Sequence, residues 1–328
     1  MKTGAGGKKP PKIVVIGGGT GLSVMLRGLK EMPLEITAIV TVADDGGSSG
    51  ILRSELHIPP PGDIRSVLMA LADVEPMLTQ LLQYRFSAGN GLAGHSLGNL
   101  ILAAMKDITG DFVAAVKELS KVLAVRGRVL PAADHAIVLK AELETGEIVT
   151  GESNIPKAGK KIKRVFIEPA DVYPLEEAAD ALHEADAIIV GPGSLYTSIM
   201  PNLLVPKLAR ILTASQALKI FVCNVMTQPG ETDDYTVGDH LTALYNHIGN
   251  HIFDYVIVNN GEIPEQILEQ YAEQGARPVG LDLGGAAGSG IAVIADQLVK
   301  YHTYLRHDAE KLSRHIMRLI DGWMAEKR

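Results

Sequence analysis

Apolar residues occur along this chain in short runs that end at glycine-rich segments. The first run, residues 13–16, stops at residues 17–21, and the apolar positions from Leu22 to Leu29 then follow a helical spacing. A second run, residues 36–42, ends at residues 44–50, and the interval between the two runs suits a βαβ crossover. The pattern therefore predicts the first strands of a parallel sheet.

Three later runs, residues 187–190, 220–223 and 255–258, are apolar throughout, as expected for parallel strands covered on both faces. Between the two sets of runs, residues 63–82 have a helical pattern, and a glycine-rich connection leads to an apolar helix at residues 100–105. These segments predict a helical layer inserted after the second strand. Apolar residues then alternate from Ile137 to Leu143, and again after a turn at Thr145-Gly146, which predicts a small antiparallel β element.

We therefore predict an α/β protein with a Rossmann-like, three-layer αβα architecture and a mainly parallel sheet. Its nucleotide-binding domain spans residues 12–306, with a helical insertion at about residues 63–128 and the β element at about residues 136–168. Residues 1–11 are expected to be a flexible tail. Residues 307–328 are expected to form an amphipathic C-terminal helix with Leu312, Ile316, Leu319 and Ile320 on one face.

Composition excludes several classes of protein. The chain has 328 residues and a formal net charge of -7, so it lacks the broad cationic surface of a general nucleic-acid binder. No stretch reaches the roughly 18 apolar residues needed to span a bilayer, and the start has no signal-peptide core. The only cysteine, Cys223, lies in an apolar run and cannot form an internal disulfide, which favours a reducing, cytoplasmic compartment.

The loop after the first strand is a candidate phosphate site. Ligands of parallel α/β sheets bind beyond the carboxyl ends of the strands, and glycines there expose amide hydrogens at a helix start, where the helix dipole favours an anion. Leu22 occupies the place of the third glycine in the dinucleotide fingerprint, so a tight turn without ligand remains the alternative. The loop residues expected to contact the ligand are Gly18, Gly19, Thr20 and Gly21.

The segment after the second strand adds carboxylates and hydroxyls. Asp44 and Asp45 are suited to a hydrated magnesium ion or a ribose, and the amides and hydroxyls that follow are suited to phosphate oxygens. The alternative is a plain solvated turn. The predicted ligand-binding residues here are Asp44, Asp45, Gly46, Gly47, Ser48 and Ser49.

Two further segments, around Asp63 and around His95, add polar side chains that are candidates for the site. Asp63 is a candidate site residue with a helix N-cap as the alternative, and Arg65 has a surface salt bridge as its alternative. His95 lies in a glycine-flanked segment that opens a helix, together with Asn99, so it is a weak candidate for phosphate binding or proton transfer; the alternative is a structural histidine.

Polar, glycine-bearing segments also follow the three later strands, at residues 191–198, 224–232 and 259–261. Five strand ends therefore present glycine, hydroxyl, amide or carboxylate groups at one edge of the sheet. This coincidence favours a ligand site over independent loops. Gly193, Ser194, Asn224 and Gln228 are the candidate ligand-binding residues of these later segments.

Several of these strings resemble the YvcK/CofD-like family. The resemblance covers residues 13–281 and is carried by residues 43–50 (ADDGGSSG), 59–65 (PPPGDIR), 191–198 (GPGSLYTS) and 224–232 (NVMTQPGET), with residues 305–308 (LRHD) adding a C-terminal match. The family joins phospholactate transferases, which build a deazaflavin cofactor, to YvcK-type proteins called gluconeogenesis factors. The sequence is most similar to the second branch.

The resemblance implies a Rossmann-like fold, a homodimer, and binding of a UDP-sugar by a regulatory protein needed for cell shape during growth on gluconeogenic carbon. By position it implies that Gly18 to Gly21, Gly193, Ser194 and Asn224 contact the nucleotide and that Arg306 meets the charged part of the ligand. A surface arginine paired with Asp308 or Glu310 is the alternative for Arg306. The sequence does not identify the sugar or a regulatory partner protein.

Two enzymatic alternatives remain open. The transferase branch uses acidic groups at the positions of Asp45 and Asp63 for a metal, and both are present here. The chain is then a magnesium-dependent 2-phospho-L-lactate transferase acting from a nucleoside diphosphate carrier, with His95 as a weak candidate base. The second alternative is an NAD-dependent oxidoreductase, which the incomplete fingerprint disfavours.

Overall fold

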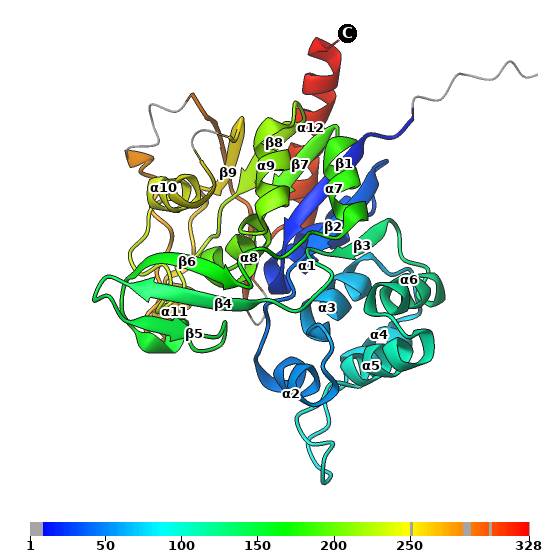
Figure 1. The fold of residues 1–328 in the computed structure, drawn as a ribbon. Coiled ribbons are helices and arrows are strands. Elements are labelled where there is room, and N and C mark those ends of the chain that lie inside the picture. Colours follow the sequence, from blue (N-terminus) through cyan, green and yellow to red (C-terminus); the bar gives the residue numbers. More distant parts are fainter. Residues whose placement is uncertain (1–8, 250–251, 285–289, 302–303, 328) are drawn as a thin grey trace, which may run out of the picture.

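A parallel sheet of seven strands forms the centre of the computed structural model, which describes residues 9–249, 252–284, 290–301 and 304–327 (Figure 1). Its strands are β1 (Lys12–Gly17), β2 (Glu35–Val40), β3 (Arg128–Pro131), β7 (Ala187–Val190), β8 (Leu218–Val222), β9 (Tyr255–Asn259) and β10 (Ala292–Asp296). The strand order is β10-β9-β8-β7-β1-β2-β3, and all neighbouring strands are parallel. Since the order reverses between β1 and β7, the topological switch point lies between these two strands.

Helices cover both faces of the sheet, which confirms the three-layer prediction. Ile13 and Val15 of β1 belong to one core, and Val14 and Ile16 belong to the other, because successive side chains of a strand point to opposite faces. The first core is completed by α1 (Gly19–Leu29), α3 (Pro61–Leu71), α6 (Phe112–Val122) and α12 (Ala309–Glu326). The second is completed by α7 (Glu176–His183), α8 (Met200–Leu203), α9 (Pro206–Ala214) and α10 (Val237–Ile248).

The helical layer between β2 and β3 differs in detail from the sequence prediction. It consists of α2 (Gly47–Leu56), α3, α4 (Pro76–Gln83), α5 (Leu97–Thr109) and α6. Residues 63–82, predicted as one helical segment, belong to two helices, because Pro76 starts a new helix at a position where its fixed φ is favourable. The serines after Gly47 lie in the first turn of α2 and not in a loop.

The predicted alternation after residue 136 is confirmed as a small antiparallel sheet of β4 (Val138–Leu143), β5 (Ile148–Thr150) and β6 (Ile162–Glu168). Leu139, Ala141 and Leu143 are fully buried against the second core. The remaining elements are α11 (Glu265–Ala272), the short turns Pro156–Ala158 and Leu195–Ile199, and the antiparallel pair β11 (Val299–Tyr301) and β12 (Leu305–His307).

The chain ends in α12, whose apolar positions Leu312, Ile316 and Ile320 are buried as predicted, and whose N-terminus is capped by the Asp308 carboxylate. Of the predicted tail, residues 1–8 lie outside the described residues. Within the described ranges, every helix is too short or too polar to cross a bilayer.

Candidate functional site

The loops after β1 and β7 approach each other closely at the switch point. A Cβ atom added at Gly21 would lie 2.8 Å from the Pro192 carbonyl oxygen, and one added at Gly193 would lie 3.2 Å from the Gly18 carbonyl oxygen. Gly19 has a φ of +69°, a conformation that glycine adopts without strain. The two loops therefore need glycines, and they place backbone amides at the N-terminus of α1.

Asn224, at the end of β8, holds the second of these loops. Its side-chain oxygen accepts a hydrogen bond from the Gly193 amide at 3.1 Å, and its side-chain nitrogen donates to the Gly193 carbonyl at 2.8 Å. Both groups of the Asn224 amide are thus engaged with the protein, which makes it a positioning residue. Ser194 follows as the residue before the π-helical turn, and its carbonyl accepts from Ser198 and Ile199.

Arg306 reaches the same place from the far end of the chain. It lies on β12 and lines a cleft of about 180 Å³ together with Gly21, Pro192, Asn224 and Tyr271. Its guanidinium lies 5.5 Å from the centre of the Tyr304 ring. The alternative of a surface ion pair is not supported, because Asp308 pairs with Lys300 and Glu310 pairs with Arg314.

The carboxylates gather beside the first loop. The Asp63 side chain contacts Gly18 and accepts a hydrogen bond from the Gly19 backbone, so it is not the N-cap of α3, a position held by Pro60. Burial and the neighbouring charge of Asp44 raise the pKa of Asp63 to about 7. The Asp45 carboxylate accepts a hydrogen bond from the Ser153 amide at 2.8 Å.

Two further acidic residues, which sequence reasoning did not select, belong to this group. Burial, followed by the charges of Asp44, Asp63 and Asp45, raises the pKa of Glu152 to about 8. Burial also raises the pKa of Glu231 to about 7. A hydrogen bond from the Thr197 hydroxyl at 2.9 Å opposes this rise, because it stabilises the charged form of Glu231. Glu231 was inside the residue string that carried the family resemblance, whereas Glu152 follows β5 in a segment without a motif.

Ser48, His95 and Asn99 form a buried polar network behind the site. The Ser48 hydroxyl lies 3.1 Å from His95 Nδ1 and accepts hydrogen bonds from the Asn99 side chain at 3.1 Å and from the Ser96 amide at 3.3 Å. All four residues are buried. This arrangement supports a positioning role for these residues more than the proton transfer considered for His95.

The other predicted residues lie around the edge of the site. Ser49 is buried against Gly62, and Asp44 accepts a hydrogen bond from the Gly46 amide at 2.9 Å. Thr20 and Gly47 are exposed. Gln228 donates to the Glu231 carboxylate at 2.6 Å, so it positions an acidic side chain and does not line the cleft beside Arg306.

A much larger cavity, of about 1100 Å³, lies at the amino end of the sheet and is lined by Lys30, Met32, Arg126 and Met324, among others. Two of its cations already have partners, because Lys30 donates to the Ala72 carbonyl and Arg126 pairs with Asp73. Parallel α/β sheets bind ligands at the carboxyl end. We therefore place the candidate functional site at the smaller cleft and at the acidic side chains beside the β1 loop.

A metal site is not prearranged in the described part of the chain, where no group of three or more His, Cys, Asp or Glu side chains is placed to hold an ion. Asp63 has Asp44 and not Asp45 as its main acidic neighbour. Oxygen ligands of this kind suit Mg²⁺, which keeps several of its waters when it binds to proteins.

The family model described as "2-phospho-L-lactate transferase CofD" matches residues 13–299. The chain is 58% identical over 311 residues to the gluconeogenesis factor of Bacillus subtilis (strain 168), covering 94% of this chain and 98% of that protein. It is 56% identical over 310 residues to the gluconeogenesis factor of Halalkalibacterium halodurans, covering 94% and 96%.

The fold agrees with this relationship. A crystal structure of a upf0052 family member from Bacillus halodurans superposes with a TM-score of 0.92 at 56% identity, covering 95% of this chain and 100% of that one. The resemblance first noted in the sequence strings is therefore confirmed over almost the full length. The chain belongs to the CofD family and is similar, within it, to proteins named gluconeogenesis factors.

Proposed function

We propose that the chain is a regulatory gluconeogenesis factor that binds a nucleotide sugar, specifically a UDP-sugar, and supports cell shape during growth on gluconeogenic carbon sources. The names of its relatives support the gluconeogenic role. The proposal places the protein in the cytoplasm, in keeping with the single buried thiol of Cys223, and includes the homodimer that the family resemblance implies.

The observation that carries the ligand assignment is the meeting of Gly21, Pro192, Asn224 and Arg306 around one cleft at the switch point. The amides at the start of α1 and the Arg306 guanidinium suit a diphosphate, which is an anion with several acceptor oxygens. The Asp44 carboxylate offers hydrogen-bond acceptors to the hydroxyl groups of a sugar. The Glu152 carboxyl group, which its raised pKa keeps largely protonated at neutral pH, offers both a donor and an acceptor. A nucleotide sugar combines both chemistries in one molecule.

A thermal-shift panel of UDP-sugars, GDP, NAD and a deazaflavin tests the proposal, because a ligand that binds only the folded state raises the melting temperature by mass action. We expect UDP-sugars to give the largest shift. A shift with NAD alone would contradict both this proposal and the transferase alternative.

The second candidate is a 2-phospho-L-lactate transferase, favoured by the description of the matching family model and by the acidic groups beside the glycine loops. In that case Asp45 and Asp63, the pair implied by the family resemblance, with Asp44 as the acidic neighbour of Asp63, would hold Mg²⁺, which when bound offsets negative charge on the phosphates. The chain's own groups would then orient the ligand: the α1 amides and Arg306 would bind phosphate oxygens.

Asp45→Asn and Asp63→Asn variants separate the two functions. Without a bridging metal, UDP-sugar affinity should stay within about tenfold of the parent, or about 1.4 kcal/mol, because neither carboxylate would contact the phosphates directly. Calorimetric titration with and without magnesium measures this. A much larger, magnesium-dependent loss would favour the transferase.

A further inference from the structure

Two half-buried arginines of the helical layer, Arg53 and Arg65, differ in how their donors are used. Arg53 donates to two backbone carbonyls, those of Ala43 at 3.1 Å and Ile137 at 2.9 Å. Arg65 donates to two hydroxyls, and its Nε is buried without an acceptor in the described part of the chain. Because a buried donor without an acceptor destabilises the folded state, Arg65 is suited to an acceptor that the protein itself does not supply.

The two hydroxyls hold the Arg65 guanidinium in place without neutralising it. They belong to Ser96, at 2.5 Å, and to Ser66, at 3.2 Å. Each hydroxyl donates in turn to a backbone carbonyl, Ser96 to that of Leu82 and Ser66 to that of Gly62. Both serines therefore accept from Arg65, and its charge is left without a counterion at these contacts.

A second arginine, Arg85, lies beside the first. It pairs with Ser96 in an isolated antiparallel bridge, and its guanidinium donates to a backbone carbonyl. Burial, and then the charge of Arg85, lower the pKa of Arg65. Asp63 and Asp44 act on that pKa in the opposite direction through their charges, but neither forms a hydrogen bond or an ion pair with Arg65. Two like charges are thus close together without a bound carboxylate of the protein.

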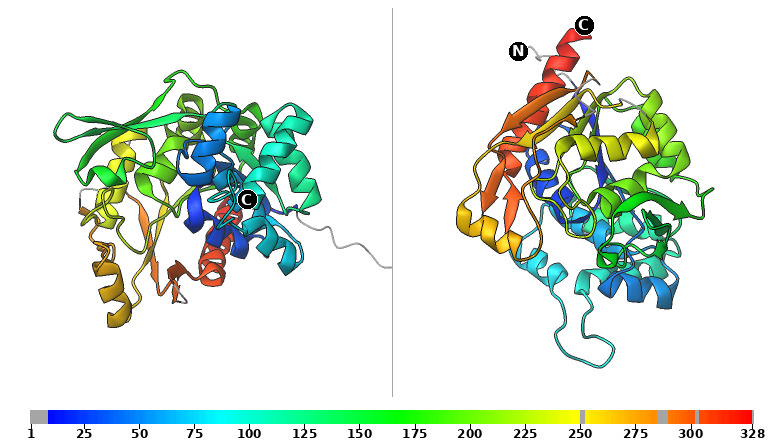
Figure 2. Two further views of the ribbon diagram at one scale, coloured as in Figure 1. Left: turned by 90° about the horizontal axis from the view of Figure 1, so that it is seen from below. Right: turned by 90° about the vertical axis from the view of Figure 1, so that its left-hand side faces the viewer.

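Arg65 also lies at the N-terminus of α5, since α3 and α5 pack against each other in the helical layer (Figures 1 and 2). A Cβ atom added at Gly98 would lie 2.7 Å from Arg65 Cδ, so this position of α5 needs a glycine. No side chain caps this helix of 13 residues, and the amides of Gly98 and Asn99 have no acceptor among the described residues. Free amides at a helix N-terminus attract an anion, as does the adjoining guanidinium.

This cationic place adjoins the candidate ligand site. Asp63 lies two residues before Arg65 on α3, a rise of about 3 Å, and its side chain contacts Gly18 in the β1 loop. The proposed function assigns the diphosphate to the β1 loop and to Arg306. The part of the ligand left to meet Arg65 is therefore the sugar.

We infer that Arg65, Arg85 and the N-terminus of α5 form an anion subsite for a carboxylate on the sugar, so that the ligand is a nucleotide sugar acid. The inference rests on the proposed function and narrows its ligand class. A carboxylate fits because it is planar and accepts two parallel hydrogen bonds from the edge of a guanidinium. The Nε of Arg65 lies on such an edge and is the donor still without an acceptor.

Calorimetric titration with UDP-glucuronate and UDP-glucose tests the inference, because the two ligands differ only in a carboxylate in place of a hydroxymethyl group. The parent should bind UDP-glucuronate at least about tenfold more tightly. Arg65→Met, which keeps an apolar stem against Gly98, should bring the ratio of the two affinities to about one, and Arg85→Gln should reduce it by about threefold. Arg318→Gln, an exposed change on α12, is the matched control and should keep the parental ratio.

Melting curves establish that each variant is folded, and Gly98→Ala, whose Cβ would displace the Arg65 side chain, is the replacement if Arg65→Met is not. Equal affinity of the parent for both ligands, or a parental ratio in folded Arg65→Met, would overturn the inference and leave UDP-sugar binding intact. A parent that binds neither ligand would contradict the proposed function and the inference together.

Discussion

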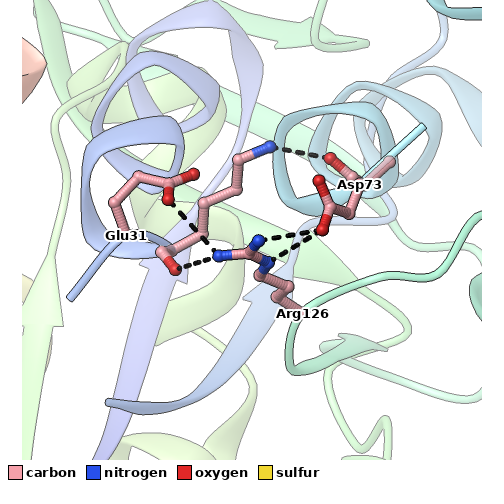
Figure 3. Close-up of polar contacts among 5 residues, drawn as sticks. Glu31, Asp73 and Arg126 are labelled. Atoms are coloured by element: carbon pink, nitrogen blue, oxygen red, sulfur yellow. Dashed lines mark hydrogen bonds and ion pairs between the residues drawn. The ribbon is translucent and has the colours of Figure 1, made fainter. Parts of the chain in front are cut away.

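Charged side chains are arranged differently at the two ends of the central sheet. At the amino end, Arg126 bonds to Asp73 at 2.8 Å and to Glu31 at 3.3 Å (Figure 3), and this arginine lowers the pKa of Asp73. At the carboxyl end, acidic residues lie together, and burial raises the pKa of Glu152 to about 8. Exposed charges are matched at the first end, whereas partly buried like charges gather at the second.

The difference supports placing the candidate functional site at the carboxyl end of the sheet. Gathering like charges in a partly buried place destabilises the folded state, and ionisable groups with strongly shifted pKa values cluster at functional sites. The larger cavity lies at the charge-matched end, so cavity size and the clustering of acidic groups indicate opposite ends of the sheet. Predictions that separate the two ends follow, beginning with the largest effect.

Gly21→Val should have the largest effect, because its Cβ would lie 2.8 Å from the Pro192 carbonyl oxygen and would force the β1 and β7 loops apart. We expect UDP-sugar affinity to fall by more than a hundredfold, about 2.7 kcal/mol, as measured by calorimetry. Gly322→Ala on α12 is the control, since a Cβ there meets nothing within 4 Å. Equal affinity in both variants would remove the switch point from the site.

Glu152→Gln should change how stability depends on pH. The folded-state pKa of Glu152 is raised from 4.5 to about 8, so the folded chain retains a proton that the unfolded chain loses, and the free energy of unfolding decreases as pH rises through this window. Without ligand, we expect the parent to lose on the order of 2 kcal/mol across it. The variant should show a shallower slope in urea unfolding measured at several pH values; identical slopes would show that Glu152 titrates normally.

Arg126→Ala should have the smallest effect, because exposed ion pairs contribute little to stability. We expect a slight decrease in melting temperature and unchanged UDP-sugar affinity. The decrease should diminish further at high salt, which screens surface charges. A loss of ligand affinity would place the amino end in the binding mechanism.

Much of the fold could be predicted from the sequence, because buried parallel strands such as β7 are continuous apolar runs and because the amphipathic α12 has a clear helical period. The strands β3 and β10 were not predicted. β3 is only four residues long and ends at a proline, so its apolar run is too short to predict a strand. β10 is different, because residues 291–295 are all apolar and the pattern was therefore sufficient to predict this edge strand.

The site could be predicted only at the level of its loops. The glycines around Gly19 and the distant Arg306 were selected correctly as neighbours, because parallel strands end at one edge and the family resemblance pointed to the C-terminal string. The pairing of Asp63 with Asp44, the addition of Glu152, and the Ser48–His95 bond depend on contacts between residues far apart in sequence. Local pattern carries no information on such contacts.

Calorimetric titration of UDP-glucose into two variants tests the central claim most directly. Arg306→Glu alters the carboxyl-end cleft, and Ala325→Trp fills the larger amino-end cavity. We predict that Arg306→Glu weakens binding by at least about a hundredfold, because a charge-assisted contact is replaced by repulsion, and that Ala325→Trp binds like the parent. Arg314→Glu, an exposed change on α12, should also bind like the parent. Parental affinity in Arg306→Glu with loss of binding in Ala325→Trp would contradict the account.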